Sequence, residues 1–420
     1  MTAPDIHRTI SAVWRIESPR LVAALAHITR DVGLAEDMAQ DALVAALEEW
    51  PNSGVPARPG AWLMTAAKRK AIDHKRHADM SEEKHEEIGR LADERSLAGP
   101  DYDSALDDDI GDELLRLIFT ACHPALPPES RTALTLRLLG GLTTDEIARA
   151  FLSTESTIAQ RIVRAKRTIA EKHIPYEVPR GMELGARLAS VLEVIYLIFN
   201  EGYTATAGDD WLRPALCEDA LRLGRVLETL MPDEAEVHGL MALMEIQASR
   251  SGARTNAAGE PILLLDQDRS RWDRMAIQRG FTALERAESL RDARGMYTAQ
   301  AAIAACHARA LTPQETDWPR IARLYDELLR IMPTPVVELN RAVAVGMARG
   351  PQAGLKLIDE LIAQGTLEGY HLLHAARADM LEKLRRFDEA RTEFQKAASL
   401  TQNQRERQLL TKRSLDHTQK

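Results

Sequence analysis

The sequence predicts an all-α fold with several domains, and three observations support this prediction. Apolar residues recur at helical spacing through most of the chain. A capping box at Thr143 and Glu146 precedes two short amphipathic helices joined by a sharp turn. Residues 79–113 carry fourteen acidic and three basic side chains, a composition typical of a linker between domains. Because 420 residues exceed what one hydrophobic core holds, we expect two or three domains.

Composition limits the class of protein. Hydrophobic residues make up 45% and charged residues 28%, which is typical of a globular chain. The net charge of −9 does not suit a protein that coats nucleic acid, so any DNA contact must come from local basic patches. The longest apolar run, residues 188–199, is too short to span a bilayer, and the first residues hold no apolar signal core. We therefore expect a cytoplasmic protein with no membrane partner.

Two helices are expected over residues 20–50, with Gly33 as the break between them. The second has an acidic outer face, which is usually solvated, made of Glu36, Asp37, Gln40, Asp41, Glu48 and Glu49. Residues 51–60, PNSGVPARPG, hold three prolines and two glycines, so an irregular loop is expected there.

A third helix begins near Trp62, and five of the nine residues 68–76 are Lys or Arg. A basic helix preceded by a Trp and a loop suits single-stranded nucleic acid, because its cations neutralise phosphates while unstacked bases stack on the aromatic ring. The alternative is a solvated surface helix with Trp62 in the core, where a Trp usually lies. Residues 79–113, with a net charge of −11, are expected to be extended or only partly helical.

Helical periodicity returns over residues 114–139, with an interruption at 123–128. The three cysteines are scattered without a CxxC pair, and Cys122 and His123 lack further ligands nearby. A structural zinc needs about four ligands, so we expect no metal site, no cofactor and no disulfide.

Residues 142–172 predict a helix-turn-helix. After a break at Leu152, Thr154 and Glu155 cap the second helix. Its core face is formed by Ile158, Ile162, Ala165 and Ile169. Its outer face is formed by Ser156, Gln160, Val163, Arg164 and Arg167. Arg and Gln can bond base edges in a major groove, and neighbouring basic residues such as Arg161 and Lys166 can neutralise phosphates. The alternative is a capped helix pair that never contacts DNA.

The order of these parts resembles the extracytoplasmic-function (ECF) class of bacterial sigma factors in the sigma-70 family. AEDMAQDALVAALEEW, residues 35–50, is similar to the helix that binds the clamp of core RNA polymerase. PGAWLMTAAKRKAIDHKRH, residues 59–77, is similar to the segment that melts and holds the −10 promoter element. Residues 126–167 are similar to the region that reads the −35 element.

The resemblance implies a role for residues at each matching position. Asp37, Gln40 and Asp41 would face the polymerase clamp. The −10 DNA would meet a loop from Asn52 to Arg58 and the residues Trp62, Lys68, Arg69, Lys70, Lys75 and Arg76. The −35 duplex would meet Ser156, Thr157, Gln160, Arg161, Val163, Arg164 and Arg167. One departure is Arg69, where the family usually has Asn, and it affects only the fine −10 contacts.

The chain continues beyond the usual end of such sigma factors. YLIFNEGYTA (196–205) and DQDRSRWD (266–273) resemble a subgroup with a long helical extension that ends in tetratricopeptide-like repeats. Periodicity supports the repeats, because small and large apolar residues alternate at the spacing of a repeat helix. The positions are Ala390, Phe394 and Ala397, then Ala353 and Leu357, then Ile321, Tyr325 and Leu328.

We therefore expect sigma region 2 over residues 1–78, the acidic linker over 79–112, sigma region 4 over 113–177 and the extension over 178–420, repeat-like from about 296. Core RNA polymerase and promoter DNA are the expected partners, and the extension is expected to regulate the sigma domains or bind a protein or peptide.

No enzyme motif is present in the sequence, so we expect a sigma factor rather than an enzyme. The alternatives are a ligand-sensing helix-turn-helix activator with a tetratricopeptide-like domain, and a helical scaffold or unrecognised enzyme. Polar residues of the 200–201 and 266–271 segments are interpreted as helix caps and buried ion pairs rather than a site. His371 and His374 are interpreted as surface or satisfied core residues.

Overall fold

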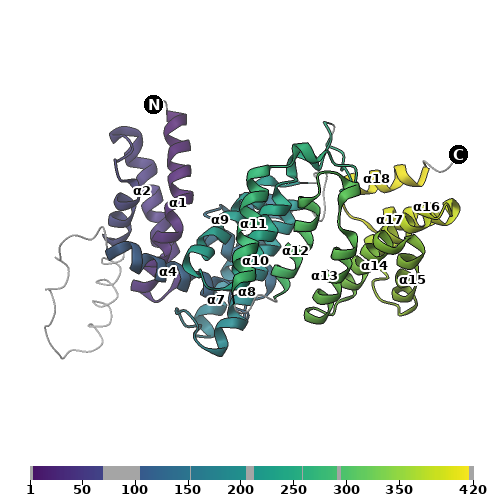
Figure 1. Ribbon diagram of the computed structural model, residues 1–420. Coiled ribbons are helices and arrows are strands. Elements are labelled where there is room, and N and C mark those ends of the chain that lie inside the picture. The colour runs from purple at the N-terminus through teal and green to yellow at the C-terminus, as the bar shows by residue number, and fades with distance from the viewer. Residues whose placement is uncertain are drawn as a thin grey trace. The chain divides into compact units, whose positions relative to one another are not determined.

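The computed structural model describes residues 3–69, 105–151, 153–204, 212–257, 259–290 and 295–415. These residues form helices joined by turns, with an isolated bridge of extended backbone between Thr255 and Pro261. The chain divides into two compact units, Met1–Val194 and Ile195–Lys420, and Figure 1 colours the helices of each in chain order. No helix in this described part is both long and apolar enough to cross a membrane. The all-α prediction is confirmed.

The first unit contains the predicted sigma regions. Its helices are α1 (Ala3–Thr29), α2 (Val32–Ser53), a helical stretch over residues 59–69, α4 (Ala105–Ala121), α5 (Pro128–Leu138), α6 (Thr144–Ala150), α7 (Glu155–Glu171) and the first part of α8 (Met182–Tyr203). α1 packs along both α2 and α4. Residues 70–104, which include most of the acidic stretch 79–113, lie outside the described residues, and α4 begins within the last part of that stretch.

Two predicted boundaries near α2 are wrong by a few residues. The chain turns at Arg30, which has a φ of 57°, and Gly33 lies inside α2. Asp31 caps this helix, because its Oδ1 accepts hydrogen bonds from the amides of Gly33 at 2.7 Å and Leu34 at 3.1 Å. At the other end α2 continues through Pro51 to Ser53, so the predicted loop shrinks to residues 54–58.

The helix-turn-helix forms as predicted. Thr143 Oγ1 accepts the amide of Glu146 at 3.1 Å, and Glu146 Oε2 accepts the amide of Thr143 at 2.8 Å, which completes the capping box of α6. Thr154 caps α7 by accepting the amide of Thr157 at 3.2 Å. The predicted core face of α7 is buried at Ile158, Ile162, Ala165 and Ile169. These caps fix the start of both helices and therefore the turn between them.

The first half of α8 closes the core of region 4. Ser190 donates a hydrogen bond to the carbonyl of Cys122 at 2.6 Å, and Arg187 donates to the carbonyl of Phe119 at 3.0 Å. Arg131 of α5 donates to the Ser190 hydroxyl and pairs with Glu193 at 3.2 Å. Cys122 is buried against this contact, and burial raises the pKa of its thiol to about 11. Helix α8 therefore belongs to the structure of region 4 as well as to the extension.

The second unit holds the rest of the extension. Its helices after α8 are α9 (Pro214–Leu230), α10 (Ala235–Ala248), α11 (Arg274–Ser289), α12 (Met296–Arg309), α13 (Trp318–Ile331), α14 (Pro335–Arg349), α15 (Pro351–Ala363), α16 (His371–Lys383), α17 (Phe387–Leu400) and α18 (Gln404–Leu415). From α13 onward each helix packs on the next, and α14 to α17 lie side by side in Figure 1. This pairwise stacking is the arrangement expected of tetratricopeptide-like repeats.

The predicted repeat positions are fully buried in one of the three repeats, at Ala390, Phe394 and Ala397 of α17. In α13, Ile321 and Leu328 are nearly fully buried, whereas Tyr325 is only partly buried. The middle repeat differs, because Ala353 and Leu357 are only partly buried.

The close helix approach of the middle repeat is made by Gly354 instead of Ala353. A Cβ on Gly354 would lie 2.8 Å from the Cα of Gly346 in α14, closer than two carbon atoms can approach. Gly354 therefore occupies the position of the small residue, one place after the predicted one.

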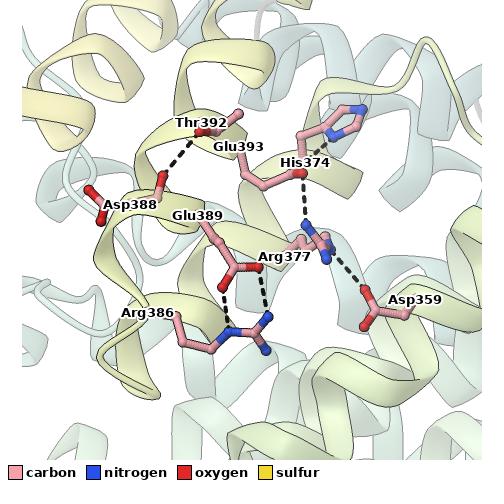
Figure 2. A network of polar contacts seen from close by, with 8 residues as sticks. All are labelled: Asp359, His374, Arg377, Arg386, Asp388, Glu389, Thr392 and Glu393. Atoms are coloured by element: carbon pink, nitrogen blue, oxygen red, sulfur yellow. Dashed lines mark hydrogen bonds and ion pairs between the residues drawn. The ribbon is translucent and has the colours of Figure 1, made fainter.

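Charged side chains join three helices of the last two repeats, as Figure 2 shows. Arg377 of α16 donates to Asp359 of α15 at 2.8 Å and to Glu393 of α17 at 2.9 Å. His374 Nδ1 lies 2.6 Å from the second oxygen of Glu393, and its ring is buried. His371 pairs with Glu406 at 3.0 Å, so both histidines have carboxylate partners. The described residues hold no cluster of three potential metal ligands.

Candidate functional site: two candidate DNA-binding surfaces

The outer face of α7 is a polar and basic surface. All five residues predicted for it are exposed: Ser156, Gln160, Val163, Arg164 and Arg167. The apolar side chain of Val163 leaves 62% of its surface accessible. Among the remaining predicted residues, Thr157 and Arg161 are half-buried at the edges of this face.

The two arginines of this face differ in their partners. Arg167 Nε donates to Glu171 Oε1 at 2.6 Å, and this hydrogen bond raises the pKa of the guanidinium above its ordinary value. Arg164 forms no ion pair with a described residue, so its five N–H donors can reach a base edge in a major groove. The face therefore combines one unpaired arginine, one paired arginine and small polar groups.

The acidic face of α2 is the second candidate contact surface. Asp37 and Asp41 are exposed, and Gln40 is half-buried between them. Val44 and Leu47, one and two turns further along α2, expose 51% and 37% of their surfaces. Acidic and apolar groups on one helical face suit a partner surface that presents basic and apolar side chains.

Glu36 is not part of this exposed face, which corrects the prediction for α2. Its side chain is only 6% exposed and contacts two cations of region 4. Arg137 Nε of α5 lies 2.6 Å from Glu36 Oε1, and Lys166 Nζ of α7 lies 2.6 Å from Glu36 Oε2. Lys166, which the sequence assigns to phosphate contacts, therefore faces region 2 in this structure.

The end of α2 and the following loop form the third predicted contact region. Asn52 is exposed in the last turn of α2, and Arg58 is exposed at the end of the loop. Trp62 is half-buried and packs edge-on against the fully buried Trp50, with ring centroids 5.3 Å apart. Part of the Trp62 side chain therefore remains accessible.

The basic helix after Trp62 is described only in its first part. Lys68 is half-buried and Arg69 is exposed on the helical stretch 59–69. Lys70, Lys75 and Arg76 lie outside the described residues. Asn52, Arg58 and Arg69 are exposed, and Trp62 and Lys68 are half-buried, within the end of α2, the loop after it and the helical stretch 59–69.

Comparison with known proteins assigns both regions. Residues 14–80 match the family described as Sigma-70 region 2, and residues 116–169 match Sigma-70 region 4. An ECF RNA polymerase sigma factor, SigK of Mycobacterium ulcerans, is 30% identical over 152 residues, which cover 35% of this chain and 76% of SigK. The chain belongs to the ECF sigma factors of the sigma-70 family. SigI of Mycobacterium tuberculosis, a probable ECF RNA polymerase sigma factor, is 30% identical over 175 residues, which cover 41% of this chain and 58% of SigI.

This sigma factor carries its extension in common with at least one relative. An uncharacterised protein of Rhizobium meliloti is 41% identical over 401 residues, which cover 95% of this chain and 93% of that protein. Residues 187–288 match a family of unknown function, DUF6596. An alignment with the crystal structure of yeast Tom70 covers 99% of this chain and 86% of the Tom70 chain, with a TM-score of 0.37 and 10% sequence identity.

The two motifs of the extension meet in an alternating stack of arginine and aromatic side chains. The guanidinium of Arg254 lies 3.6 Å from the ring centroid of Tyr203. Arg250 lies 5.8 Å from both Tyr203 and Trp272, and Arg269 lies 5.1 Å from Trp272. All three arginines are buried, and cation–π contacts compensate part of their lost hydration.

Hydrogen bonds in these motifs hold irregular backbone. Arg269 donates to the carbonyls of His307 and Ala310, both at 2.9 Å. Asp268 accepts the amide of Ser270 at 2.9 Å and caps a short 3-10 turn. Glu201 pairs with Arg213. These contacts are those of caps and buried polar clusters in the sigma factor's extension.

Proposed function

We propose that this sigma factor directs core RNA polymerase to promoters through three surfaces of its first unit. Asp37, Gln40 and Asp41 bind the polymerase clamp. The α7 face carried by Arg164 and Gln160 reads the −35 element in the major groove. The protein works in the cytoplasm and catalyses no reaction of its own.

The −10 element is bound by the end of α2, the loop after it and the helical stretch 59–69. Arg69 contacts phosphates, and Asn52, Arg58 and the accessible part of Trp62 receive unstacked bases. The same role is proposed for Lys68, Lys70, Lys75 and Arg76. By opening the −10 duplex, this part of region 2 would expose the template strand that the polymerase copies.

The observation that carries this proposal is the exposed outer face of α7. Its partly uncovered Val163 lies beside Arg164, which has no ionic partner among the described residues. Apolar contact with a thymine methyl group and bidentate hydrogen bonds to a guanine are the contacts such a pair can make.

Reconstituted transcription tests the proposal. Core polymerase is mixed with the purified chain and genomic DNA, and the RNA 5′ ends are sequenced. We expect RNA to start at defined positions that share −10 and −35 sequences. Failure to bind core polymerase, with duplex DNA binding retained, would replace the sigma assignment by that of a helix-turn-helix activator.

The extension is proposed to regulate the sigma regions or to bind a protein or peptide. Repeat stacks of this kind present extended surfaces for such partners. A chain ending after Tyr203 keeps all of α8, so that Arg187 and Ser190 still support region 4. A second chain ending at Pro179 lacks these contacts and serves as the control for damage to region 4. If the longer truncation starts RNA with unchanged strength and control, the regulatory role is wrong.

A further inference from the structure

Three buried arginines of the extension carry more positive charge than their described surroundings compensate. The residues Arg250, Arg254 and Arg269 expose only 9%, 8% and 3% of their surfaces. A buried charge is stable when an opposite charge or a full set of hydrogen bonds replaces its lost water. In the described part of the chain, however, neither Arg250 nor Arg269 forms an ion pair with a carboxylate.

Arg269 has neutral hydrogen-bond acceptors among the described residues. Its guanidinium donates to two backbone carbonyls and to the hydroxyl of Thr316 at 3.0 Å. The carboxylate of Glu315 attracts it without forming an ion pair, and this carboxylate accepts two backbone amides. Burial, and then the charge of Arg250, lower the pKa of the Arg269 guanidinium. These contacts hold the side chain in place but leave its charge without a counter-ion.

Arg250 has no hydrogen-bond acceptor among the described residues. Its guanidinium carbon lies 5.8 Å from the ring centroids of Tyr203 and Trp272, and its Nε is buried without an acceptor. Contacts with aromatic rings offset only part of the cost of burying a charge. In the described structure, Trp272 Nε1 and Arg269 Nε are also buried donors without an acceptor. One side-chain cluster therefore presents several N–H donors to an acceptor that these residues do not supply.

The cluster is not sealed from solvent. Tyr203, the last residue of α8, and the following Thr204 are half-buried. The guanidinium of Arg254 lies 3.6 Å from the ring centroid of Tyr203, and it donates to the Thr204 hydroxyl at 2.8 Å. Because these two residues keep part of their surface accessible, a small solute can approach the arginines from their side of the cluster.

We propose that Arg250, Arg254 and Arg269 form a binding site for the phosphate group of a small molecule. A phosphate group carries about two negative charges at neutral pH, so it compensates more of this positive charge than a carboxylate does. The planar fork of a guanidinium bonds two phosphate oxygens at once. The site lies within residues 187–288, which match the family of unknown function. It does not depend on the promoter contacts proposed for the first unit.

Isothermal titration calorimetry of the full chain tests the site. Inorganic phosphate and glycerol 3-phosphate are compared, so that the free ion is distinguished from an esterified phosphate, and acetate represents a carboxylate. All titrations use sodium chloride at matched ionic strength, which excludes a general effect of salt. We expect one phosphate group bound per chain, and acetate bound at least about tenfold more weakly.

The variant Arg250→Met keeps the apolar stem of the side chain and removes its charge. We expect it to bind phosphate at least about tenfold more weakly than the parent chain. In phosphate-free buffer it should unfold at the same or a higher urea concentration, because the charge that it removes has no counter-ion. Arg271→Met removes an exposed arginine of the same segment and should change neither result. Arg250→Lys keeps the charge without the planar fork and should also weaken binding, so the test does not depend on one variant folding.

The chain's own carboxylates are the competing occupants of the site. The sequence places Asp209 and Asp210 shortly after Tyr203, outside the described residues. The double variant Asp209→Asn, Asp210→Asn should bind phosphate as the parent does. Binding in this variant alone would show that these acids fill the site and would overturn the proposal.

Three other results would also overturn the phosphate site. The first is the absence of phosphate binding in the parent chain, and the second is tighter binding of acetate than of either phosphate. The third is an unchanged phosphate affinity in Arg250→Met, with circular dichroism showing a folded chain, because Arg250 would then have a structural role alone.

Discussion

Protonation of His307 should destabilise the extension as the pH falls below neutrality. The ring is buried at the end of α12 and packs edge-on against Trp318, with centroids 5.2 Å apart. Burial, and then the charges of Arg250 and Arg269, lower the pKa of His307 to about 3. The unfolded chain binds this proton near pH 6.5, whereas the folded chain does not. The stability is therefore complete above pH 6.5 and is lost progressively as the pH falls toward 3.

The size of the effect follows from proton linkage. Between pH 7 and pH 5 the unfolded state gains nearly one proton on this ring while the folded state gains none, which costs about 2 kcal/mol of unfolding free energy. Urea unfolding at the two pH values measures this change in unfolding free energy. Hydrogen exchange of the α12 amides then shows whether the change belongs to the second unit, which holds His307, or to the first. The variant His307→Phe keeps an aromatic ring against Trp318 and cannot titrate.

Because each variant is compared with itself at the two pH values, any packing cost of the phenyl ring cancels. We expect His307→Phe to lose about 2 kcal/mol less than the parent chain between pH 7 and pH 5. A matched control is His123→Gln in the first unit, whose histidine also has a lowered pKa, about 4. It should leave the exchange of α12 unchanged. An equal pH dependence of α12 in the parent and His307→Phe would refute the assignment.

Four further substitutions test the helices that carry the proposed function. Thr143→Ala removes the capping box of α6 and should lower the stability of the first unit by about 1 kcal/mol in thermal unfolding, with no change if the cap is dispensable. Phe394→Ala opens a cavity at a fully buried repeat position and should cost about 3 to 5 kcal/mol in the C-terminal helices, measured by urea unfolding. Arg164→Ala should weaken binding of the specific −35 duplex by about 1 to 3 kcal/mol, whereas Arg167→Ala should mainly lower the salt dependence. Equal losses on all sequences for both arginine variants would contradict base reading by Arg164.

Local patterns predicted the helix-turn-helix well because its signals lie within one or two turns. The hydroxyl of Thr143 and the carboxylate of Glu146 sit three residues apart, and the buried positions of α7 follow from spacing alone. The repeat position Phe394 was predictable for the same reason. The end of α2 was not, because a proline is a strong breaker signal, yet Pro51 occupies the last turn of a helix whose other residues pack well.

The buried ion pairs of Glu36 could not have been predicted from periodicity. Its partner Arg137 is 101 residues away, and helical spacing places Glu36 next to exposed acids such as Asp37. Nothing local distinguishes a glutamate that meets solvent from one that meets another domain. Likewise, the one-residue shift from Ala353 to Gly354 depends on how closely α14 approaches, which is a property of the packed pair.

The dependence of region 4 on α8 has a consequence for synthesis of the protein. A nascent chain that has passed the helix-turn-helix still lacks Arg187 and Ser190, so region 4 stays incomplete until the extension begins to emerge. Products of premature termination near Pro179 should therefore be digested quickly by cellular proteases, which limited proteolysis of that fragment would measure.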